Sequence, residues 1–257
     1  MKNKKKYVND RRNNILKFIN ENKKASVEKL SEFFNVSAIT IRRDLQYLED
    51  NNKLIRFYGG AKAKENVIID SVSEREICKQ QLAKYAASLI NDGDTIFINS
   101  SSTSIKILDF IDKKNVTVIT NNIKAVNVEL KNNMNVIITG GEIRHPKEIL
   151  LGDYAIKTLQ NIYAKKSFIG CSGVSLECGM TTSNANEVNI NKLMIEHTTL
   201  DTYFIADYTK ICKNSSFITC NSSNIKNLIT DDKVPEKILD LFRKNGTKIH
   251  IVKINYE

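Results

Sequence analysis

Segment 38–50 brings a hydroxyl, two arginines and an amide together at helical spacing. On a wheel of about 100° per residue, Ile41, Leu45 and Leu48 share one face, which predicts the buried side of a helix. The opposite face and its flanks carry Thr40, Arg42, Arg43, Gln46 and Tyr47. Arginine can donate two hydrogen bonds to guanine or grip phosphate, and threonine and glutamine reach base edges. The spacing therefore predicts a helix that enters the major groove of DNA; a merely solvated charged face is the alternative.

Two further helices and a small basic strand surround this segment in the sequence. Apolar residues at helical spacing predict a helix over 10–22, and Ser26 stands where it would cap a second helix. Ser37 occupies the capping position of the third helix. The run 53–60 alternates apolar and basic residues and ends in two glycines, which predicts a strand and a wing against the DNA. The residues expected at DNA are Ser26, Ser37, Thr40, Arg42, Arg43, Gln46, Tyr47, Arg56, Gly59 and Gly60.

Positive charge is concentrated in the same part of the chain. Residues 1–64 have a net charge of +9, whereas residues 65–257 have a net charge of +1. This asymmetry favours a polyanionic partner for the N-terminal part and a nearly neutral, separately folded remainder. Five scattered cysteines without a Cys-x-x-Cys pair indicate reduced thiols and a cytoplasmic protein. Neither a secretory signal nor an apolar run of membrane-spanning length occurs, so no membrane contact is expected.

Short apolar runs alternate with helical stretches through the larger part of the chain. Strands are predicted over 95–99, 116–120, 135–139, 167–170, 202–206, 227–230 and 248–252. Helices are predicted over 73–91, 104–111, 123–130, 154–161, 187–197 and 235–244. This alternation predicts an α/β fold with a mostly parallel sheet covered on both faces. Ligands of such sheets bind beyond the carboxyl ends of the strands, so the residues that follow the strands are the expected ligand contacts.

Those residues are rich in hydroxyls, glycines and charges. Asn99 precedes five hydroxyl residues, 100–104, and such a run at a helix start offers phosphate side-chain donors and free backbone N–H groups. A polar surface loop with simple helix capping explains the run equally well. Arg144 can meet an anion. The expected contacts of a small, phosphorylated ligand are Asn99, Ser100, Ser101, Ser102, Thr103, Ser104, Asn121, Gly140, Gly141, Glu142, Arg144, Ser172, Gly173, Asp207 and Lys210.

The run NVSAITIRRDLQYLEDNNKLIRFYGGA resembles the helix-turn-helix and wing of the DeoR family of bacterial transcription regulators. The similarity extends over roughly residues 8–252, on LINDGDTIFI, TGGEIR, FIGCSGV and CGMTT. The resemblance implies a winged helix-turn-helix over 8–63, a linker over 64–73, and a sensor domain over 74–257 that is similar in fold to sugar-phosphate isomerases. It also implies a dimer or tetramer that binds operator DNA, commonly as a repressor, and responds to a phosphorylated sugar or related metabolite.

The sensor part departs from the family pattern at several positions. Asn99 stands where the family has an acid, and Ser101 stands where it has a glycine. Ser172 replaces a carboxylate, and Asn191-Lys192 replaces a basic pair, which leaves Lys192 as the expected effector contact there. These differences concern the effector and leave the helix-turn-helix unchanged.

The competing interpretation is a sugar-phosphate isomerase with a basic N-terminal arm. Proton transfer between carbons needs a positioned acid–base group. The resemblance places Asn99 and Ser172 where the related enzymes have carboxylates, although Glu142 and Asp207 remain. A regulator without catalytic residues is therefore the main expectation. The three histidines lack metal-ligand spacing and no G-x-x-x-x-G-K-[ST] motif occurs, so neither a metal nor a cofactor is expected.

Overall fold

The chain folds as two compact units. The computed structural model describes residues 2–50, 53–57, 59–63, 69–144 and 149–256. The units are Met1–Glu74 and Arg75–Glu257. Their boundary lies inside one continuous helix, α4 (Ile69–Ser88), whose first residues belong to the N-terminal unit.

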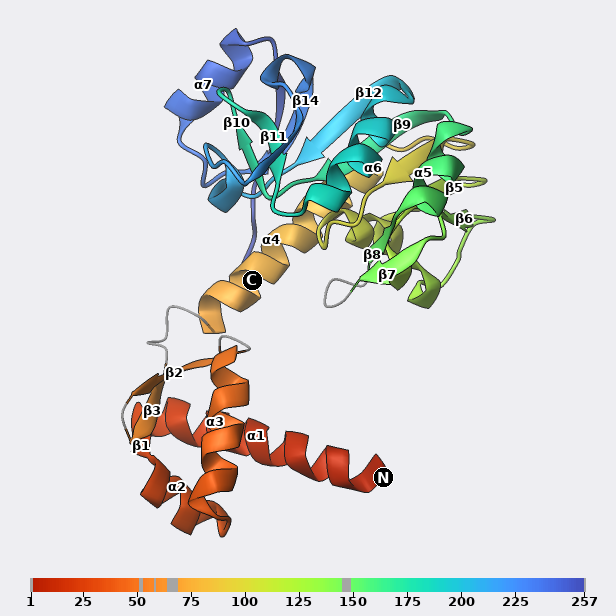
Figure 1. Cartoon of the computed structure of the whole chain (residues 1–257). Coiled ribbons are helices and arrows are strands. Elements are labelled where there is room, and N and C mark those ends of the chain that lie inside the picture. The colour runs from red at the N-terminus through yellow and green to blue at the C-terminus, as the bar shows by residue number, and fades with distance from the viewer. Residues whose placement is uncertain (1, 51–52, 58, 64–68, 145–148, 257) are drawn as a thin grey trace. The chain divides into compact units, whose positions relative to one another are not determined.

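The N-terminal unit consists of three helices and a small antiparallel sheet (Figure 1). Its elements are α1 (Lys2–Asn22), β1 (Lys24–Ser26), α2 (Val27–Phe34), α3 (Ala38–Asp50), β2 (Leu54–Phe57) and β3 (Gly60–Ala63). The strand order is β1-β3-β2. Ile15 and Ile19 of α1 meet Leu30, Ile41 and Leu45 in a core where all five side chains are fully buried. The three predicted helices and the predicted strand are confirmed.

Two features of this unit differ from the prediction. Helix α1 begins at Lys2 rather than near residue 10. Its added segment is lysine-rich, and lysine is a good helix former, but the segment lacks the apolar stripe by which periodicity is detected. Strand β1 lies where the polar run 22–25 predicts a break. It pairs antiparallel with β3, which sets buried Ala25 opposite buried Ala61. A strand of three residues is too short to show a period of two.

A seven-stranded sheet forms the centre of the C-terminal unit, in the order β15-β14-β12-β9-β4-β5-β6, and every neighbouring pair is parallel. The strands are β4 (Thr95–Ile98), β5 (Thr117–Thr120), β6 (Asn135–Ile138), β9 (Ala164–Gly170), β12 (Thr198–Ile205), β14 (Asn227–Asp231) and β15 (Lys248–Val252). All seven predicted strands lie in this sheet, so the α/β fold with a mostly parallel sheet is confirmed. Residues that follow these strands are therefore gathered at one edge.

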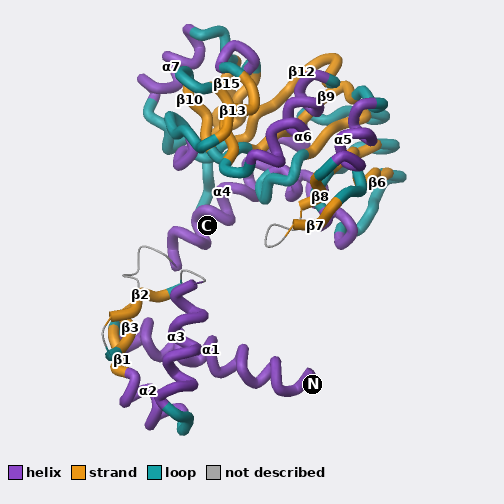
Figure 2. The backbone as a smooth tube through the Cα atoms, in the orientation of Figure 1, coloured by secondary structure: helices purple, strands orange, loops and turns teal. Residues whose placement is uncertain are grey.

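Helices cover both faces of the sheet (Figure 2). The covering elements are α4, the 3₁₀ helices η1 (Ser104–Phe110) and η2 (Ile123–Asn127), and the helices α5 (Asp153–Gln160), α6 (Ala185–Glu196) and α7 (Glu236–Lys244). One face buries Ile96, Ile98 and Phe168 under α4, η1 and η2. The other face buries Phe97 and Ile169 under α5, α6 and α7. Neighbouring residues of a strand point to opposite faces, which explains why these strands are apolar throughout.

Short elements account for the remaining differences in this unit. The segments 104–111 and 123–130, which were expected to be α-helices, form η1 and η2, with i to i+3 bonds such as Ala125 N–H to the Asn122 carbonyl at 3.2 Å. Both helices are short, at seven and five residues, and 3₁₀ geometry is typical of short pieces. Of the expected linker, residues 64–68 lie outside the described residues, and residues 69–73 form the start of α4.

The short antiparallel strands of the same unit were not predicted from the sequence. They are the hairpin β7 (Glu142–Arg144) and β8 (Ile149–Leu151), and the sheet of β10 (Gly173–Ser175), β11 (Gly179–Thr182) and β13 (Phe217–Cys220). Runs of three or four residues carry no readable period. Strand β13 joins β11 across more than thirty residues of sequence, as in the pair Thr182 and Phe217. These strands therefore depend on contacts that a local pattern does not contain.

A buried ion pair at β4 and β9 gives a test of the fold. Lys166 Nζ lies 2.8 Å from Asp94 Oδ2 and 2.8 Å from the Leu89 carbonyl, and Lys165 Nζ lies 3.3 Å from Asp94 Oδ1. We expect Lys166→Met to lower the free energy of unfolding in urea by about 3 kcal/mol, because the buried Asp94 carboxylate keeps only the more exposed Lys165. Lys165→Met is the matched control and should cost less than about 1 kcal/mol.

The pH dependence of this loss follows from the pKa of Asp94. Burial raises that pKa, but the hydrogen bonds from Lys166 and from the Asn91 N–H outweigh burial and hold it below its usual value. The stabilisation by Lys166 should therefore be full above the usual aspartate pKa of about 4, and it should be lost as the pH falls through the lowered pKa. Equal losses for the two lysine variants at neutral pH would contradict the assignment.

Candidate DNA-binding surface and ligand pocket

Helix α3 presents its polar side chains to solvent. Arg42, Arg43, Gln46 and Tyr47 are exposed, and Thr40 is half-buried. The opposite face packs into the core, as the helical wheel predicts, with Ile41, Leu45 and Leu48 at most 4% exposed. Neither Arg42 nor Arg43 forms an ion pair with any described residue, so both guanidinium groups are available to an anion. This face has the residue types that read base edges and grip phosphate.

A buried carboxylate holds α3 against α1. Asp44 is 2% exposed and accepts hydrogen bonds from Arg11 Nε at 2.7 Å and from Arg12 Nε at 2.8 Å. The Arg12 guanidinium also lies over the Tyr47 ring, 3.7 Å from its centroid. The arginine pair at the start of the N-terminal helix pattern therefore stabilises the unit and orients the polar face of α3. Sequence reasoning missed Asp44 because an acidic residue on a basic helix gives no sign of burial.

The serines and glycines that are expected to contact DNA also have structural roles in this unit. Ser26 Oγ accepts from the Lys29 N–H at 3.2 Å and caps α2, and Ser37 Oγ accepts from the Thr40 N–H at 3.3 Å at the start of α3. Gly59 adopts φ +84°, which a side chain disfavours. A Cβ on Gly60 would stand 2.4 Å from the Ala25 carbonyl, so glycine is required where β3 meets β1. Their contacts with DNA stay predictions.

Arg56 of the wing is held by side chains of α3. Its guanidinium donates to the Gln46 side-chain oxygen and pairs with Glu49 Oε2 at 3.8 Å. The backbone N–H of Arg56 donates to Glu49 Oε1 at 3.0 Å. The wing strand and α3 therefore present Gln46 and Arg56 together, which is compatible with one shared surface toward DNA.

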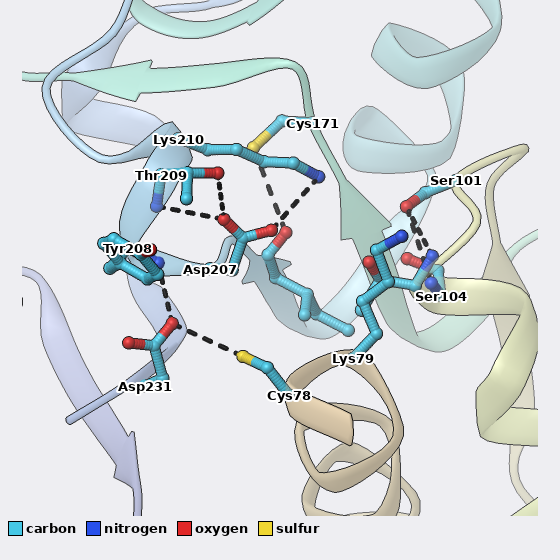
Figure 3. A network of polar contacts seen from close by, with 12 residues as sticks. Cys78, Lys79, Ser101, Ser104, Cys171, Asp207, Tyr208, Thr209, Lys210 and Asp231 are labelled. Atoms are coloured by element: carbon cyan, nitrogen blue, oxygen red, sulfur yellow. Dashed lines mark hydrogen bonds and ion pairs between the residues drawn. The ribbon is translucent and has the colours of Figure 1, made fainter. Parts of the chain in front are cut away.

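In the C-terminal unit, a cavity of about 360 Å³ opens at the carboxyl edge of the parallel sheet. Its walls come from the loop after β4, the start of η2, the turn after β9, and η3 (Tyr208–Lys210). The lining residues are Asn99, Ser100, Ser101, Ser102, Asn122, Lys124, Gly170, Cys171, Ser172, Thr182, Glu187 and Lys210. Figure 3 shows three of them, Ser101, Cys171 and Lys210, on separate segments. Six of the expected contacts thus meet here, namely Asn99, Ser100, Ser101, Ser102, Ser172 and Lys210.

The Asn99 side chain joins the ends of β4 and β9. Its Nδ2 donates to the Gly170 carbonyl at 2.8 Å and to Asn191 Oδ1 at 3.0 Å. Its Oδ1 accepts from the N–H groups of Gly170 at 3.0 Å and Ser101 at 3.3 Å. The amide is buried and its hydrogen-bonding capacity is used, so Asn99 positions the serine loop, and its contact with a ligand stays a prediction. A Cβ on Gly170 would stand 2.0 Å from Ser101 Oγ, so only glycine admits this loop.

The other expected effector contacts lie outside the cavity lining that the described residues form. Thr103, Ser104 and Asn121 are buried, Gly140, Gly141 and Glu142 lie at β7, and Gly173 begins β10. Lys192 lines a second hollow of about 240 Å³ with residues of α6 and β13. Asp207 does not line the cavity but lies 4.0 Å from Lys210 Nζ. The side chain of Arg144 lies outside the described residues. As effector contacts, all of these residues stay predictions.

Several lining residues were not expected from the sequence. Asn122 and Lys124 follow β5, and the neighbouring prediction of Asn121 was the one signal that pointed there. Thr182 belongs to β11 and was missed because the sheet of β10, β11 and β13 was missed. Glu187 lies on the predicted helix α6, but its sequence gives no sign that it faces the cavity. Thr182 Oγ1 donates to Glu187 Oε2 at 2.9 Å, so the carboxylate enters the cavity wall as an acceptor.

The charges and donors of the cavity favour a polar anion. Lys124 and Lys210 supply two ammonium groups against the single carboxylate of Glu187 among the lining residues. The serine hydroxyls add neutral donors and acceptors. Burial raises the pKa of the Cys171 thiol to about 12, so this sulfur stays protonated at neutral pH and is a poor nucleophile. The arrangement fits binding of an anionic polyol better than covalent chemistry.

Comparison with known protein families identifies both units. Residues 74–232 match the family described as the DeoR C terminal sensor domain, and residues 11–67 match the DeoR-like helix-turn-helix domain. The chain belongs to the DeoR family. A DeoR-family chain is a transcription regulator, so this membership favours the regulator over the isomerase interpretation.

Similar DeoR-family regulators span nearly the whole chain. An uncharacterized HTH-type transcriptional regulator, YulB, from Bacillus subtilis is 32% identical over 96% of this chain and 98% of its own length. A putative aga operon transcriptional repressor from Escherichia coli is 28% identical over 95% of this chain and 94% of its own length. A lactose phosphotransferase system repressor from Staphylococcus epidermidis is 30% identical over 89% of this chain and 94% of its own length.

Among solved structures, ribose 5-phosphate isomerase A from Methanocaldococcus jannaschii matches with a TM-score of 0.39 at 14% identity, over 55% of this chain and 56% of that chain. The match therefore spans about half of either protein. Within the part of this DeoR-family chain that the structure describes, no helix is both long and apolar enough to cross a membrane. No three His, Cys, Asp or Glu side chains of the described residues are grouped to hold a metal ion.

The Asp44 cluster gives a test of how this DeoR-family chain holds α3. Asp44→Asn keeps the side-chain volume but removes the charge that faces two guanidinium groups. We expect the opening free energy of α3 amides in hydrogen exchange to fall by about 3–5 kcal/mol, because a buried ion pair loses one partner. Asp10→Asn, at an exposed site on α1, is the control and should change the opening free energy of the α3 amides by less than about 0.5 kcal/mol. Similar effects of both variants would show that the cluster does not hold α3.

Proposed function

We propose that the chain is a repressor whose α3 reads operator DNA and whose C-terminal cavity takes a phosphorylated sugar that changes operator affinity. The observation that carries the proposal is the pairing, within one DeoR-family chain, of an arginine-bearing exposed helix with a cavity of two lysines and four serines. Relatives named for lactose phosphotransferase and aga operon repression support a sugar-related role. The relatives described above that span nearly the whole chain are named as regulators, which supports this function over the isomerase alternative.

The proposed operator-binding form is a dimer or tetramer. The proposed location is the cytoplasm, because operator DNA is the target. Two copies would present two α3 helices to half-sites about one helical turn apart or a multiple of it. The proposed DNA contacts are those of α3 and the wing. The proposed effector contacts are the cavity lysines, Lys124 and Lys210, and the serines of the loop after β4.

Substitution of Arg43 tests the DNA-binding half of the proposal. Fluorescence anisotropy would follow the full chain on DNA from upstream of its own gene, with excess non-specific competitor at fixed salt. We expect Arg43→Ala to weaken specific binding by about 1–3 kcal/mol if Arg43 contacts a base, or to weaken all sequences alike with a shallower salt dependence if it contacts phosphate.

Lys17→Ala on α1, whose side chain is exposed, is the charge-matched control and should leave specificity unchanged. No change in either affinity or salt slope for Arg43→Ala would refute the assignment of α3 as the recognition helix.

Substitution of Lys210 tests the effector half. Calorimetry of the full chain with a panel of hexose and pentose phosphates, and with inorganic phosphate, would find the compound that binds. We expect Lys210→Met to weaken its binding by at least about tenfold, since the charge-assisted bond to phosphate contributes about 1.5–3 kcal/mol. Lys237→Met, at an exposed lysine of α7, is the control and should bind as the wild type does. Unchanged binding by Lys210→Met would place the ligand elsewhere.

A further inference from the structure

Helix α4 contacts two elements that adjoin segments lining the cavity. On one side, Glu76 Oε1 of α4 lies 2.5 Å from Lys106 Nζ of η1, the 3₁₀ helix that continues the serine loop. On the other side, Cys78 of α4 donates from Sγ to Asp231 Oδ2 at 3.5 Å. Figure 3 shows this second contact, with Asp231 joined by dashed lines to both Cys78 and Tyr208. One turn of α4 therefore contacts both η1, which follows the serine loop, and the end of β14.

Asp231 connects α4 to the turn that carries Lys210. The same Oδ2 atom that faces Cys78 accepts the Tyr208 N–H at 2.7 Å, and Tyr208 and Lys210 belong to the single 3₁₀ turn η3. Asp231 is fully buried and Cys78 is 5% exposed, so bulk solvent does not reach this oxygen. Burial raises the pKa of the Cys78 thiol, and the nearby Asp231 carboxylate raises it further, so the sulfur keeps its proton and remains a donor.

The Lys210 ammonium is weakly held in the structure. Its Nζ lies 4.0 Å from Asp207 Oδ2, at the limit of an ion pair, and its side chain is 23% exposed at the cavity. Asp207 also accepts from the Thr209 N–H at 3.0 Å, so it shapes the turn η3. An anion in the cavity would compete with Asp207 for the ammonium. That competition changes the restraints on η3, whose Tyr208 N–H is bound to Asp231.

Helix α4 runs from these contacts into the N-terminal unit. It is continuous from Ile69 to Ser88, and its residues 69–74 belong to the unit that carries α3. We propose that α4 reads the occupancy of the cavity through two contacts, Cys78 with Asp231 and Glu76 with Lys106, and that these contacts couple the ligand to operator affinity. The inference rests on the proposed function, because it requires that an anionic ligand binds in the cavity.

Spatial connection alone does not establish coupling, so the test measures it directly. The full chain carries both Cys78→Ala and Lys106→Gln, which remove the thiol donor and the ammonium group. The matched control carries Cys212→Ala and Lys113→Gln, at an exposed thiol and at a lysine that pairs only with neighbouring Asp112 among the described ion pairs. The probe is the hexose or pentose phosphate that binds tightest in calorimetry, with inorganic phosphate beside it. Operator affinity is measured without the probe and with saturating probe.

We expect the probe to change operator affinity of the wild type and of the control by about 5–150-fold, the usual range of allosteric coupling. In the double variant we expect less than about twofold change, with the probe's own dissociation constant within about threefold of the wild-type value. Cys78→Ser with native Lys106 keeps a donor toward Asp231 and should retain the coupling. Urea unfolding shows whether the double variant is folded. If the double variant is not folded, the effect of the probe on operator affinity is compared between the wild type and Cys78→Ser.

The outcomes separate the two claims. A double variant that binds the probe and couples like the wild type overturns the role of α4 and leaves the proposed function intact. A wild type whose operator affinity no probe changes overturns the proposed effector function, and the inference falls with it. Lost coupling in Cys78→Ser as well as in the double variant would show that hydrogen bonding to Asp231 is not what matters, which also overturns the inference.

Discussion

The parallel direction of seven strands decides where this chain can bind a ligand, because it sends the loop after every strand to the same edge of the sheet. The Asn99 amide orders two of the segments that line the cavity at that edge. It binds both the N–H and the carbonyl of Gly170, which joins the ends of β4 and β9, and it orders the start of the serine loop through the Ser101 N–H. An aspartate could accept these bonds but could not donate to the Gly170 carbonyl. The departure from the family pattern at Asn99 is thus part of a complete hydrogen-bond set, which Asn191 completes.

Charge in the N-terminal unit has two different uses. Arg11 and Arg12 enclose the buried Asp44 and so stabilise the packing of α3. Arg42 and Arg43 remain on the exposed face of α3. A net charge of +9 over residues 1–64 therefore overstates the charge that is free to meet DNA. Arg11 and Arg12 fix the orientation of α3 through Asp44, and the proposed DNA contacts of Arg42 and Arg43 depend on that orientation.

The sequence predicts those elements whose pattern is local. The helical stripe of Ile41, Leu45 and Leu48, the caps Ser26 and Ser37, and the seven apolar strands all carry their signal within a few residues, and all are found. Strands β10, β11 and β13 depend on pairing between distant short runs, so the place of Thr182 at the cavity could not be predicted from a local pattern. Helix α6 was predicted, but its sequence does not tell that Glu187 faces the cavity. The serine run illustrates a further limit. Ser100, Ser101 and Ser102 line the cavity at the sheet edge, where the run was predicted to lie, but Thr103 and Ser104 are buried. A run of consecutive hydroxyl residues does not tell which of the side chains point into the protein.

Thermodynamic reciprocity tests most directly whether the cavity governs operator binding. The dissociation constant of the bound sugar phosphate would be measured by calorimetry on the free full chain and on the chain saturated with operator DNA. Linkage requires that these two constants differ by the same factor by which the compound changes operator affinity. We expect that factor to be about 5–150-fold. Equal constants for the free and the operator-bound chain would contradict the account, because a ligand that binds both states equally cannot shift one into the other.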